Sequence, residues 1–312
     1  MKKTKIISIT GPTASGKTAL AIGLAKRIGA QIVSCDSMQI YKYLEIGTAK
    51  PTAEERAEVK HHLIDFVDPR DNYSCASYVD DAKATIATLG SNGIIPLFCG
   101  GTGLYIDSLV SGTDFSDAGS DDAYREELSA FAEKNGNAAL FDLLKKIDPE
   151  SAAKTHENNV KRVIRALEIH HVTGKTKSYW DSVSRTSESP YDELRFVIDF
   201  KDRNVLYSRI DSRVDAMFDK GLFEEVKSLS ASGILVRGTT AAQAIGYKEI
   251  IDVIDGLTSL DEANALVKKN TRNYAKRQLT WFRRGQGGVT VFADESINYE
   301  YIVNICENYL IS

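Results

Sequence analysis

The chain has 312 residues, of which 43% are hydrophobic and 26% are charged. These values are ordinary for a globular protein of one large domain or two smaller ones, and they allow a sizeable core. The net charge of −4 excludes a protein that binds nucleic acid through its overall charge, so any such contact requires a local basic patch.

The N-terminus, MKKTKIISITG, begins with basic residues, but its apolar run is only about four residues long. This run is too short for a signal peptide or a membrane span, so we expect a first β-strand and no contact with a membrane. The four cysteines are scattered, without CxxC spacing or a neighbouring His cluster. This pattern predicts reduced thiols in the cytosol rather than disulfides or a zinc site.

Strands and helices alternate in the first third of the chain. Apolar runs predict strands at 5–10, 30–36 and 94–103, and apolar residues at helical spacing predict helices at 18–29 and 76–90. This alternation predicts a parallel α/β sheet with helices on both faces.

The pattern changes after residue 113, where helical periodicity continues to residue 188 without a convincing strand. We predict an all-α insertion domain at 114–188, in which Asp121 or Asp122 caps a helix and Pro149 starts another. A linker at 187–193 is expected to return the chain to the core domain.

The rest of the chain mixes two short strands with long helices. The predicted strands are 194–200 and 288–293, and the predicted helical stretches are 203–232, 239–256, 260–284 and a terminal helix. The predicted domains are therefore a core formed by 1–113 and 189–312, with a C-terminal helical part, and the insertion at 114–188.

Residues 11–18 fit the pattern G-x-x-x-x-G-K-[ST] between a predicted strand and a predicted helix. Backbone N–H groups, the helix N-terminus and the Lys17 ammonium group all favour an anion there, and the Thr18 hydroxyl suits a phosphate oxygen or Mg²⁺. We therefore predict an α/β fold with a P-loop NTPase-like core. The residues expected to bind a diphosphate or nucleotide are Gly11, Pro12, Thr13, Ala14, Ser15, Gly16, Lys17 and Thr18.

The loop alone does not determine which phosphate compound binds. A P-loop kinase or ATPase usually places a carboxylate for Mg²⁺ at the end of an apolar strand. Asp65 follows only two apolar residues, and the strand that runs into Gly100 and Gly101 ends without an acid. These features weaken ATP hydrolysis as the function without excluding it.

Two further loops are expected at the same edge of the sheet. Asp36 directly follows the second predicted strand, and Thr102 lies in the glycine-rich turn GGTGLY after a later one. Because the carboxyl ends of parallel strands border the ligand crevice, Asp36 should face Lys17 and accept a proton or bind an exocyclic amine. The alternatives are a helix N-cap at Asp36 or Ser37 and a plain strand–helix turn at Thr102.

Two predicted helices are basic. Lys161, Arg162 and Arg165 lie on or beside the face opposite an apolar stripe, and the segment 268–288 has seven Lys or Arg residues, no acid and interleaved aromatics. Such segments suit RNA phosphates and unstacked bases. The alternatives are a solvated basic face and aromatics that belong to the core.

Two sequence motifs with weaker signals complete the set of candidate sites. Arg209 and Arg213 lie four residues apart on one helix face and suit either a diphosphate or nearby Asp residues. The segment QAIGYKE, 243–249, predicts a glycine-interrupted turn with Lys248 exposed.

Together, these motifs resemble one family, the tRNA dimethylallyltransferases, also called tRNA isopentenyltransferases. The resemblance covers nearly the whole chain in the right order, and its later motifs are far more specific than the P-loop. The motifs are GPTASGKT, DSMQIY, IGTAKP, HHLID, GGTGLY, KRVIRALE, SRIDSRVDAMFDKGL, AIGYKE and AKRQLTWFR.

The resemblance implies that the P-loop holds dimethylallyl diphosphate, whose prenyl group is transferred to N6 of an adenosine just 3′ of the tRNA anticodon. It implies that Asp36 is the general base and that Thr102 lies near the reaction centre. Leaving-group stabilisation falls to Lys17, Thr18 and Arg209 or Arg213, aided by Mg²⁺ with Thr18 as a ligand.

The resemblance also implies a set of contacts with the tRNA anticodon stem-loop. These residues are Asp36, Ser37, Met38, Gln39, Thr102, Arg125, Lys161, Arg162, Val163, Ile164, Arg165, Gln243, Ala244, Ile245, Gly246, Tyr247, Lys248, Lys276, Arg277, Gln278, Leu279, Thr280, Trp281, Phe282 and Arg283. No Cys/His set matches the zinc finger of the eukaryotic members, and we expect the bacterial, cytoplasmic and monomeric form.

Two other functions remain open from the residues. One is a P-loop kinase that phosphorylates a nucleoside or another small molecule with ATP. The other is an RNA-binding module whose P-loop acts as a nucleotide switch.

Overall fold

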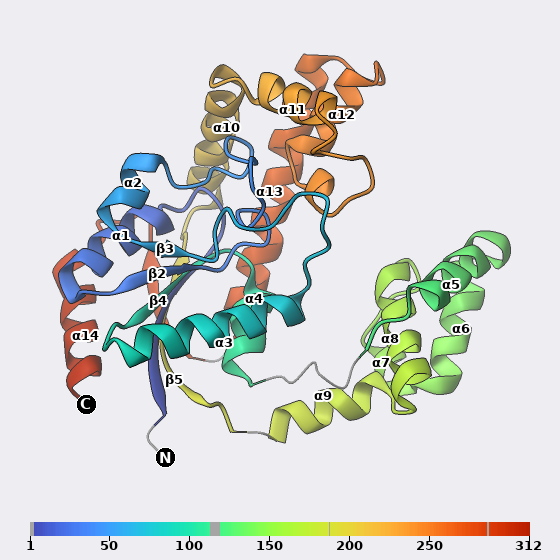
Figure 1. The fold of residues 1–312 in the computed structure, drawn as a ribbon, viewed down its shortest axis with the longest axis horizontal. Coiled ribbons are helices and arrows are strands. Elements are labelled where there is room, and N and C mark those ends of the chain that lie inside the picture. Colours follow the sequence, from blue (N-terminus) through green and yellow to red (C-terminus); the bar gives the residue numbers. More distant parts are fainter. Residues whose placement is uncertain (1–2, 113–118, 187, 286) are drawn as a thin grey trace. The chain divides into compact units, whose positions relative to one another are not determined.

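The structure is a computed structural model that describes residues 3–112, 119–186, 188–285 and 287–312. It divides into two compact units (Figure 1). The core unit comprises Met1–Leu109 and Tyr191–Ser312, and the insertion unit comprises Val110–Pro190. No helix in the described part of the chain is both long and apolar enough to cross a bilayer.

A six-stranded sheet forms the centre of the core unit, with all neighbouring strands parallel and in the order β3-β2-β4-β1-β5-β6. The predicted parallel α/β sheet is therefore confirmed. Because the strands are parallel, the loops that follow them meet at one edge. The strands are β1 (Thr4–Thr10), β2 (Gln31–Ser34), β3 (His61–His62), β4 (Pro96–Gly100), β5 (Tyr191–Asp199) and β6 (Val289–Phe292).

Helices cover both faces of this sheet (Figure 1). On one face, Ile7 and Ile9 of β1 pack with residues of α1 (Lys17–Ile28) and α14 (Tyr299–Ile311). On the other face, α3 (Cys75–Ser91) lies against β2, where the buried Tyr78 hydroxyl donates to the Ser34 carbonyl at 3.1 Å. Two short helices complete this part, α2 (Ala53–Glu58) and α4 (Gly103–Val110).

The C-terminal helices of the core unit enclose a second hydrophobic cluster. The predicted helical stretch 203–232 is two helices, because the chain breaks at Lys220 and Gly221. The next stretch is also interrupted, at Gly246, whereas the helix predicted at 260–284 has those bounds. The elements are α10 (Arg203–Asp219), α11 (Leu222–Ala231), the 3₁₀ turn η1 (Ala241–Gln243), α12 (Tyr247–Ile254) and α13 (Leu260–Arg284).

The insertion unit contains helices and no strand among its described residues, and its core includes Leu140, Leu144 and Leu167. Asp121 caps the first helix by accepting from the Tyr124 N–H, and Pro149 starts the third. The predicted linker 187–193 is wrong at its end, because Tyr191–Glu193 pair with β1 as part of β5. The helices are α5 (Asp122–Asn135), α6 (Asn137–Ile147), α7 (Pro149–Ala153), α8 (Val160–Thr173) and α9 (Lys177–Thr186).

Candidate active site

The P-loop connects β1 to α1 at the carboxyl edge of the sheet. Gly11 has φ 148°, and a Cβ atom there would lie 2.7 Å from the Ile198 carbonyl oxygen, so no larger residue fits against β5. Gly16 precedes α1, and no side chain caps the helix N-terminus. The first N–H groups of α1 are therefore available to an anion, where the helix dipole also favours negative charge.

Lys17 supplies the full positive charge of this loop. Its Nζ donates to the Pro12 carbonyl at 2.5 Å and lies 3.5 Å from the Ser15 hydroxyl. Burial of the ammonium group lowers the Lys17 pKa to about 8. The positive charge of Arg213 also lowers this pKa, whereas Cys99 and Asp36 raise it. A desolvated cation of this kind gains strongly when an anion enters beside it.

Arg213 extends the positive charge from α10 to the P-loop. Its Nη1 donates to the Thr13 hydroxyl at 3.0 Å, and burial lowers its pKa while Asp36 opposes that shift. Arg209 also lines the cavity, but its guanidinium donates to the Ala293 carbonyl at 3.0 Å and lies over the Phe200 ring. Of the two arginines predicted to stabilise the leaving group, Arg213 is the one that contacts the P-loop.

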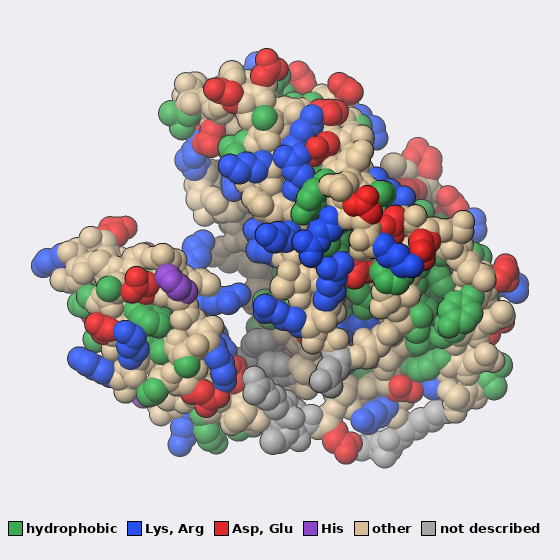
Figure 2. All heavy atoms as spheres, turned by 180° about the vertical axis from the view of Figure 1, so that it is seen from behind, with side chains coloured by type: hydrophobic (Ala, Val, Ile, Leu, Met, Phe, Trp, Pro, Cys, Tyr) green, Lys and Arg blue, Asp and Glu red, His purple; other side chains and the backbone are tan. Residues whose placement is uncertain are grey.

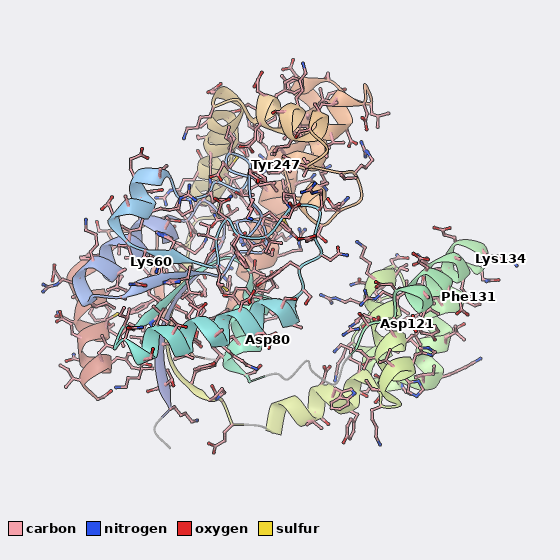
Figure 3. The ribbon with its side chains drawn as sticks, in the orientation of Figure 1. Lys60, Asp80, Asp121, Phe131, Lys134 and Tyr247 are labelled. Atoms are coloured by element: carbon pink, nitrogen blue, oxygen red, sulfur yellow. The ribbon has the colours of Figure 1, made fainter. Side chains whose placement is uncertain are left out.

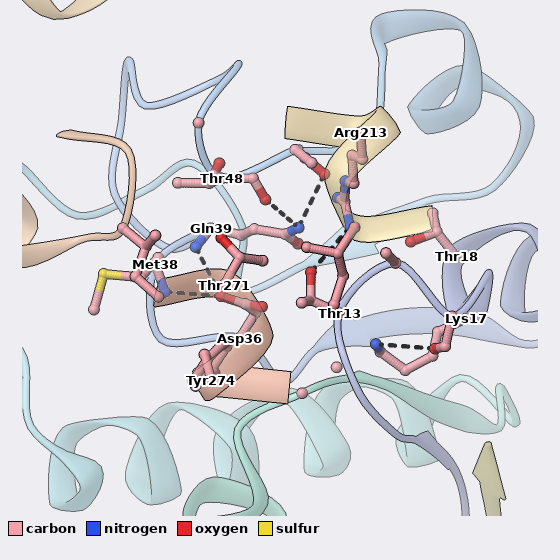
Figure 4. A pocket seen from close by; sticks show the side chains of 18 of the residues that line it. Thr13, Lys17, Thr18, Asp36, Met38, Gln39, Thr48, Arg213, Thr271 and Tyr274 are labelled. Atoms are coloured by element: carbon pink, nitrogen blue, oxygen red, sulfur yellow. Dashed lines mark hydrogen bonds between the residues drawn. The ribbon is translucent and has the colours of Figure 1, made fainter. Parts of the chain in front are cut away.

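Asp36 makes a capping contact in its own turn and also lines the cavity. Its Oδ1 accepts from the Met38 N–H at 2.9 Å and the Gln39 N–H at 3.3 Å, which is a local capping contact. Its Oδ2 makes no hydrogen bond with any described residue, and Asp36 lines the same cavity as the P-loop (Figure 4). One carboxylate oxygen therefore fixes the turn, while the other is unengaged.

Thr102 lies behind the Asp36 loop rather than on the cavity wall. Its Oγ1 accepts from the Ser37 N–H at 3.0 Å, and its own N–H donates to the Cys35 carbonyl at 3.1 Å. Burial together with the Asp36 carboxylate raises the pKa of Tyr274 of α13, and the Thr102 hydroxyl opposes that shift. Thr102 is thus bound to the residue next to Asp36, and it is not among the described residues that line the cavity.

The cavity of the core unit has a volume of about 860 Å³. It joins the P-loop, the Asp36–Gln39 segment, α10 and α13. The Gln39 amide holds another part of the wall by donating to the Thr48 and Ala49 carbonyls, at 3.1 Å each. Some lining residues had no predicted role, although four of them lie in the motifs IGTAKP and SRIDSRVDAMFDKGL. These lining residues are Gly47, Thr48, Ala49, Met217, Thr271 and Tyr274.

The cavity suits Mg²⁺ that arrives with a phosphate ligand. The described residues contain no group of three His, Cys, Asp or Glu side chains that could hold a metal by themselves. Thr18 nevertheless provides a hydroxyl on the cavity wall. Mg²⁺ commonly takes one or two protein oxygens and otherwise binds phosphate oxygens and water, so Thr18 fits the ion.

The predicted RNA-contact segment 276–283 has two sides. Lys276, Arg277, Thr280, Trp281 and Arg283 are exposed, and Lys and Arg side chains gather over the C-terminal helices (Figure 2). Two of the exposed residues are also engaged within the core unit, since Arg283 forms a bidentate pair with Asp199 and the Trp281 indole donates to Asp107. The side chains of Leu279 and Phe282 are buried, which corrects the prediction for these two residues, whereas Gln278 is buried but lines the cavity.

The predicted contacts at 243–248 are divided in the same way. Gln243 and Ile245 are at least partly exposed along the cavity, and Lys248 is half-buried and pairs with Glu249 at 3.5 Å. Gly246 and Tyr247 are buried, which corrects the prediction for these two residues, whereas Ala244 is buried but lines the cavity. Tyr247 lies among the C-terminal helices (Figure 3), where its hydroxyl donates to Glu225 at 2.6 Å.

In the insertion unit, Lys161 and Arg162 are exposed on α8. Val163 and Ile164 pack into the core of that unit, which corrects the prediction that their side chains contact RNA. Arg125 and Arg165 both bind the buried Glu168 carboxylate, at 2.8 and 2.7 Å. The ion pairs with Glu168 therefore fix these two arginines in place, and both side chains remain partly exposed.

The carboxylate that a P-loop kinase uses for Mg²⁺ has no counterpart among the described candidates. Asp65 accepts from the buried Lys50 ammonium group at 2.8 Å, and β4 ends at Gly100 without an acid. The parallel sheet, the P-loop and an unengaged carboxylate oxygen on one cavity wall instead define a P-loop α/β enzyme that acts on a phosphate compound.

Comparison with known proteins identifies the family. A family model described as IPP transferase matches residues 39–285, and one described as isopentenyl transferase matches residues 4–68. The tRNA dimethylallyltransferase of Caldanaerobacter subterraneus subsp. tengcongensis is 44% identical, over 98% of this chain and 97% of its own. That of Carboxydothermus hydrogenoformans is 48% identical, over 90% and 89%. The chain therefore belongs to the tRNA dimethylallyltransferase family, and the predicted resemblance is confirmed.

Solved structures agree with this assignment. The full-length tRNA isopentenylpyrophosphate transferase of Bacillus halodurans is 42% identical with a TM-score of 0.71, covering 99% of this chain and 96% of that one. A eukaryotic dimethylallyltransferase, solved acting on tRNA, is 27% identical with a TM-score of 0.84, covering 98% of this chain and 79% of that one. The P-loop NTPase-like fold and the assignment as a transferase are thereby confirmed.

Proposed function

We propose that the protein transfers the dimethylallyl group of dimethylallyl diphosphate to N6 of the adenosine on the 3′ side of the tRNA anticodon and releases diphosphate. The observation that carries the proposal is the unengaged Oδ2 of Asp36 on the same cavity wall as Lys17 and Arg213. A kinase needs no base for an aromatic amine, and its usual acidic residue is missing at the end of β4.

The proposed reaction breaks the bond between the allylic carbon and the diphosphate oxygen. The N–H groups at the start of α1, Lys17 and Arg213 stabilise the charge that develops on the leaving group. The N6 nitrogen forms the new bond to carbon, and its proton passes to Asp36 because the delocalised amine is a weak nucleophile. Mg²⁺ bound at Thr18 and the diphosphate oxygens would add further charge neutralisation.

We further propose that the enzyme works as a cytoplasmic monomer and holds RNA through its exposed basic residues. A stacked adenosine cannot reach a site lined by the P-loop, so the target base has to leave the anticodon stack. Phosphate contacts are proposed for the exposed cations of α8 and α13, and base contacts for the cavity segment that begins at Asp36. These residues are Ser37, Met38, Gln39, Lys161, Arg162, Lys276 and Arg277.

Incubation with radiolabelled dimethylallyl diphosphate and a tRNA that has adjacent adenosines in its anticodon loop tests the proposal. Label should enter the tRNA, and inorganic diphosphate should appear in equal amount. An unlabelled tRNA, or phosphoryl transfer from ATP that needs no tRNA, would contradict it and favour the kinase.

Asp36→Asn is the matched variant for this assay. Asparagine keeps an oxygen for the Met38 and Gln39 N–H groups but cannot take a proton, so kcat should fall about 100-fold or more while tRNA affinity stays within about twofold. Asp80→Asn, an exposed position on α3, is the control. Equal activity of Asp36→Asn and wild type would remove Asp36 as the base.

A further inference from the structure

The Gln278 side chain joins two loops at the carboxyl edge of the sheet. It is 5% exposed, although it lies in the segment that the sequence assigns to RNA contact. Its Oε1 accepts from the Thr13 N–H and its Nε2 donates to the Gly101 carbonyl, both at 2.9 Å. The first partner follows β1 and the second follows the neighbouring strand β4.

Both partners are fixed by these contacts. Thr13 is held by Gln278 of α13 through its N–H and by Arg213 of α10 through its hydroxyl, so two helices set the position of the P-loop. At Gly101, a Cβ atom would lie 2.2 Å from the Gln278 Nε2. The absence of a side chain there is therefore what allows the amide to reach the backbone.

The contact continues from Gly101 to the proposed base. The next residue, Thr102, binds the Ser37 N–H and the Cys35 carbonyl, which flank Asp36 in the sequence. A path of hydrogen bonds and one peptide bond thus connects the diphosphate cradle to the loop that holds Asp36. Gln278 is the one side chain of α13 that bonds directly to the P-loop backbone among the described residues.

We propose that Gln278 is a positioning residue that sets the P-loop at a fixed distance from the Asp36 loop. The inference rests on the proposed function for the chemistry it serves, and it replaces the predicted RNA contact at this position. Lys276 and Arg277 on the exposed part of α13 remain available to RNA, so one helix carries RNA contacts and, on its buried side, the support of the diphosphate site.

Gln278→Met tests this assignment, because methionine has a similar volume and makes neither hydrogen bond. We expect the affinity for inorganic diphosphate, measured by calorimetry without tRNA, to fall about tenfold, and kcat to fall by a similar factor. The tRNA dissociation constant should stay within twofold of wild type. Asn273→Ala, an exposed change on the same helix, is the control. Weakened tRNA binding with normal diphosphate binding would overturn the proposal.

Gln278→Glu provides a second test and decides the matter where Gln278→Met does not fold. A protonated carboxylic acid donates to the Gly101 carbonyl and accepts from Thr13, as the amide does, whereas the carboxylate only accepts. The ratio of diphosphate affinity in the variant to that in wild type should therefore rise as pH falls from 8 to 5. A ratio that does not change with pH would overturn the proposal.

Diphosphate binding separates this inference from the proposed function. If wild-type protein binds diphosphate but never labels tRNA, the proposed reaction fails, and the effect of Gln278 on the cradle is still measured. If tRNA is labelled and Gln278→Met binds diphosphate as wild type does, the positioning role alone fails.

Discussion

At the scale of the residue, the ammonium group of Lys17 is buried and largely desolvated. Its pKa is lowered to about 8 by burial, from the ordinary 10.5. In the free protein most of the charge is therefore present at neutral pH, and it is lost as pH rises through about 8. A bound diphosphate reverses the shift, because an anion beside the ammonium favours its charged form.

Diphosphate affinity should consequently fall as pH rises from 8, by up to about tenfold per pH unit, because binding requires Lys17 to regain a proton. Calorimetric titration with inorganic diphosphate between pH 7 and 9.5 measures this loss. Lys17→Arg keeps its charge over the whole range and should lack it. The same loss in both proteins would show that another group titrates, since the ionisation of diphosphate itself is common to both.

At the scale of the element, sequence patterns located the long helices and the central strands well. Helix α13 has the predicted bounds because a capping box of Ser259 and Glu262 starts it and Gly285 follows its last residue. The two-residue strand β3 was missed because pairing with β2, Ile32 with His61, defines it rather than any local pattern. The short helices α2 and α4 are likewise too brief for a periodic signal.

The candidate site was predicted as sequence motifs, and a motif does not say which side of a helix faces the core. Lys17 was found from the P-loop pattern, Asp36 because loops after parallel strands converge, and Arg213 from its spacing to Arg209 on one helix face. Tyr247 and Leu279 were misassigned because their motifs are contiguous in sequence, whereas exposure on a helix alternates with a period of 3.6 residues. Only tertiary packing shows that both side chains point inward.

Tyr247 tests that correction within the C-terminal helices. Its hydroxyl donates to Glu225 of α11. Glu225 also accepts from the Glu45 and Ile46 N–H groups at 3.3 and 2.9 Å, so it connects the loop at Glu45 and Ile46 to α11. Tyr247→Phe should lower the free energy of unfolding by about 1–2 kcal/mol in urea titrations and leave tRNA affinity within about twofold. Tyr301→Phe, exposed on α14, should change neither quantity. A specific loss of tRNA affinity would restore Tyr247 as an RNA contact.

At the scale of the whole molecule, a net charge of −4 is compatible with RNA binding because ion pairs neutralise only part of the basic surface. On α13, Lys268 pairs with Asp215 and Arg272 with Asp211, both at 2.6 Å. Lys276 and Lys161 are exposed and form no ion pair with a described residue. The core unit and the insertion unit therefore each offer a cation to RNA phosphates.

Salt dependence should reveal both contributions. Each phosphate contact adds about 0.7 to 0.9 to the slope of log affinity against log salt concentration, so Lys161→Ala and Lys276→Ala should each reduce the slope by about that amount. The double variant should lose about twice as much, since the two lysines belong to separate units and contact different phosphates. Lys134→Ala, an exposed lysine of α5, should leave the slope unchanged. Filter binding to tRNA at KCl concentrations from about 50 to 300 mM measures this slope. An unchanged slope in Lys161→Ala alone would remove Lys161 as a phosphate contact.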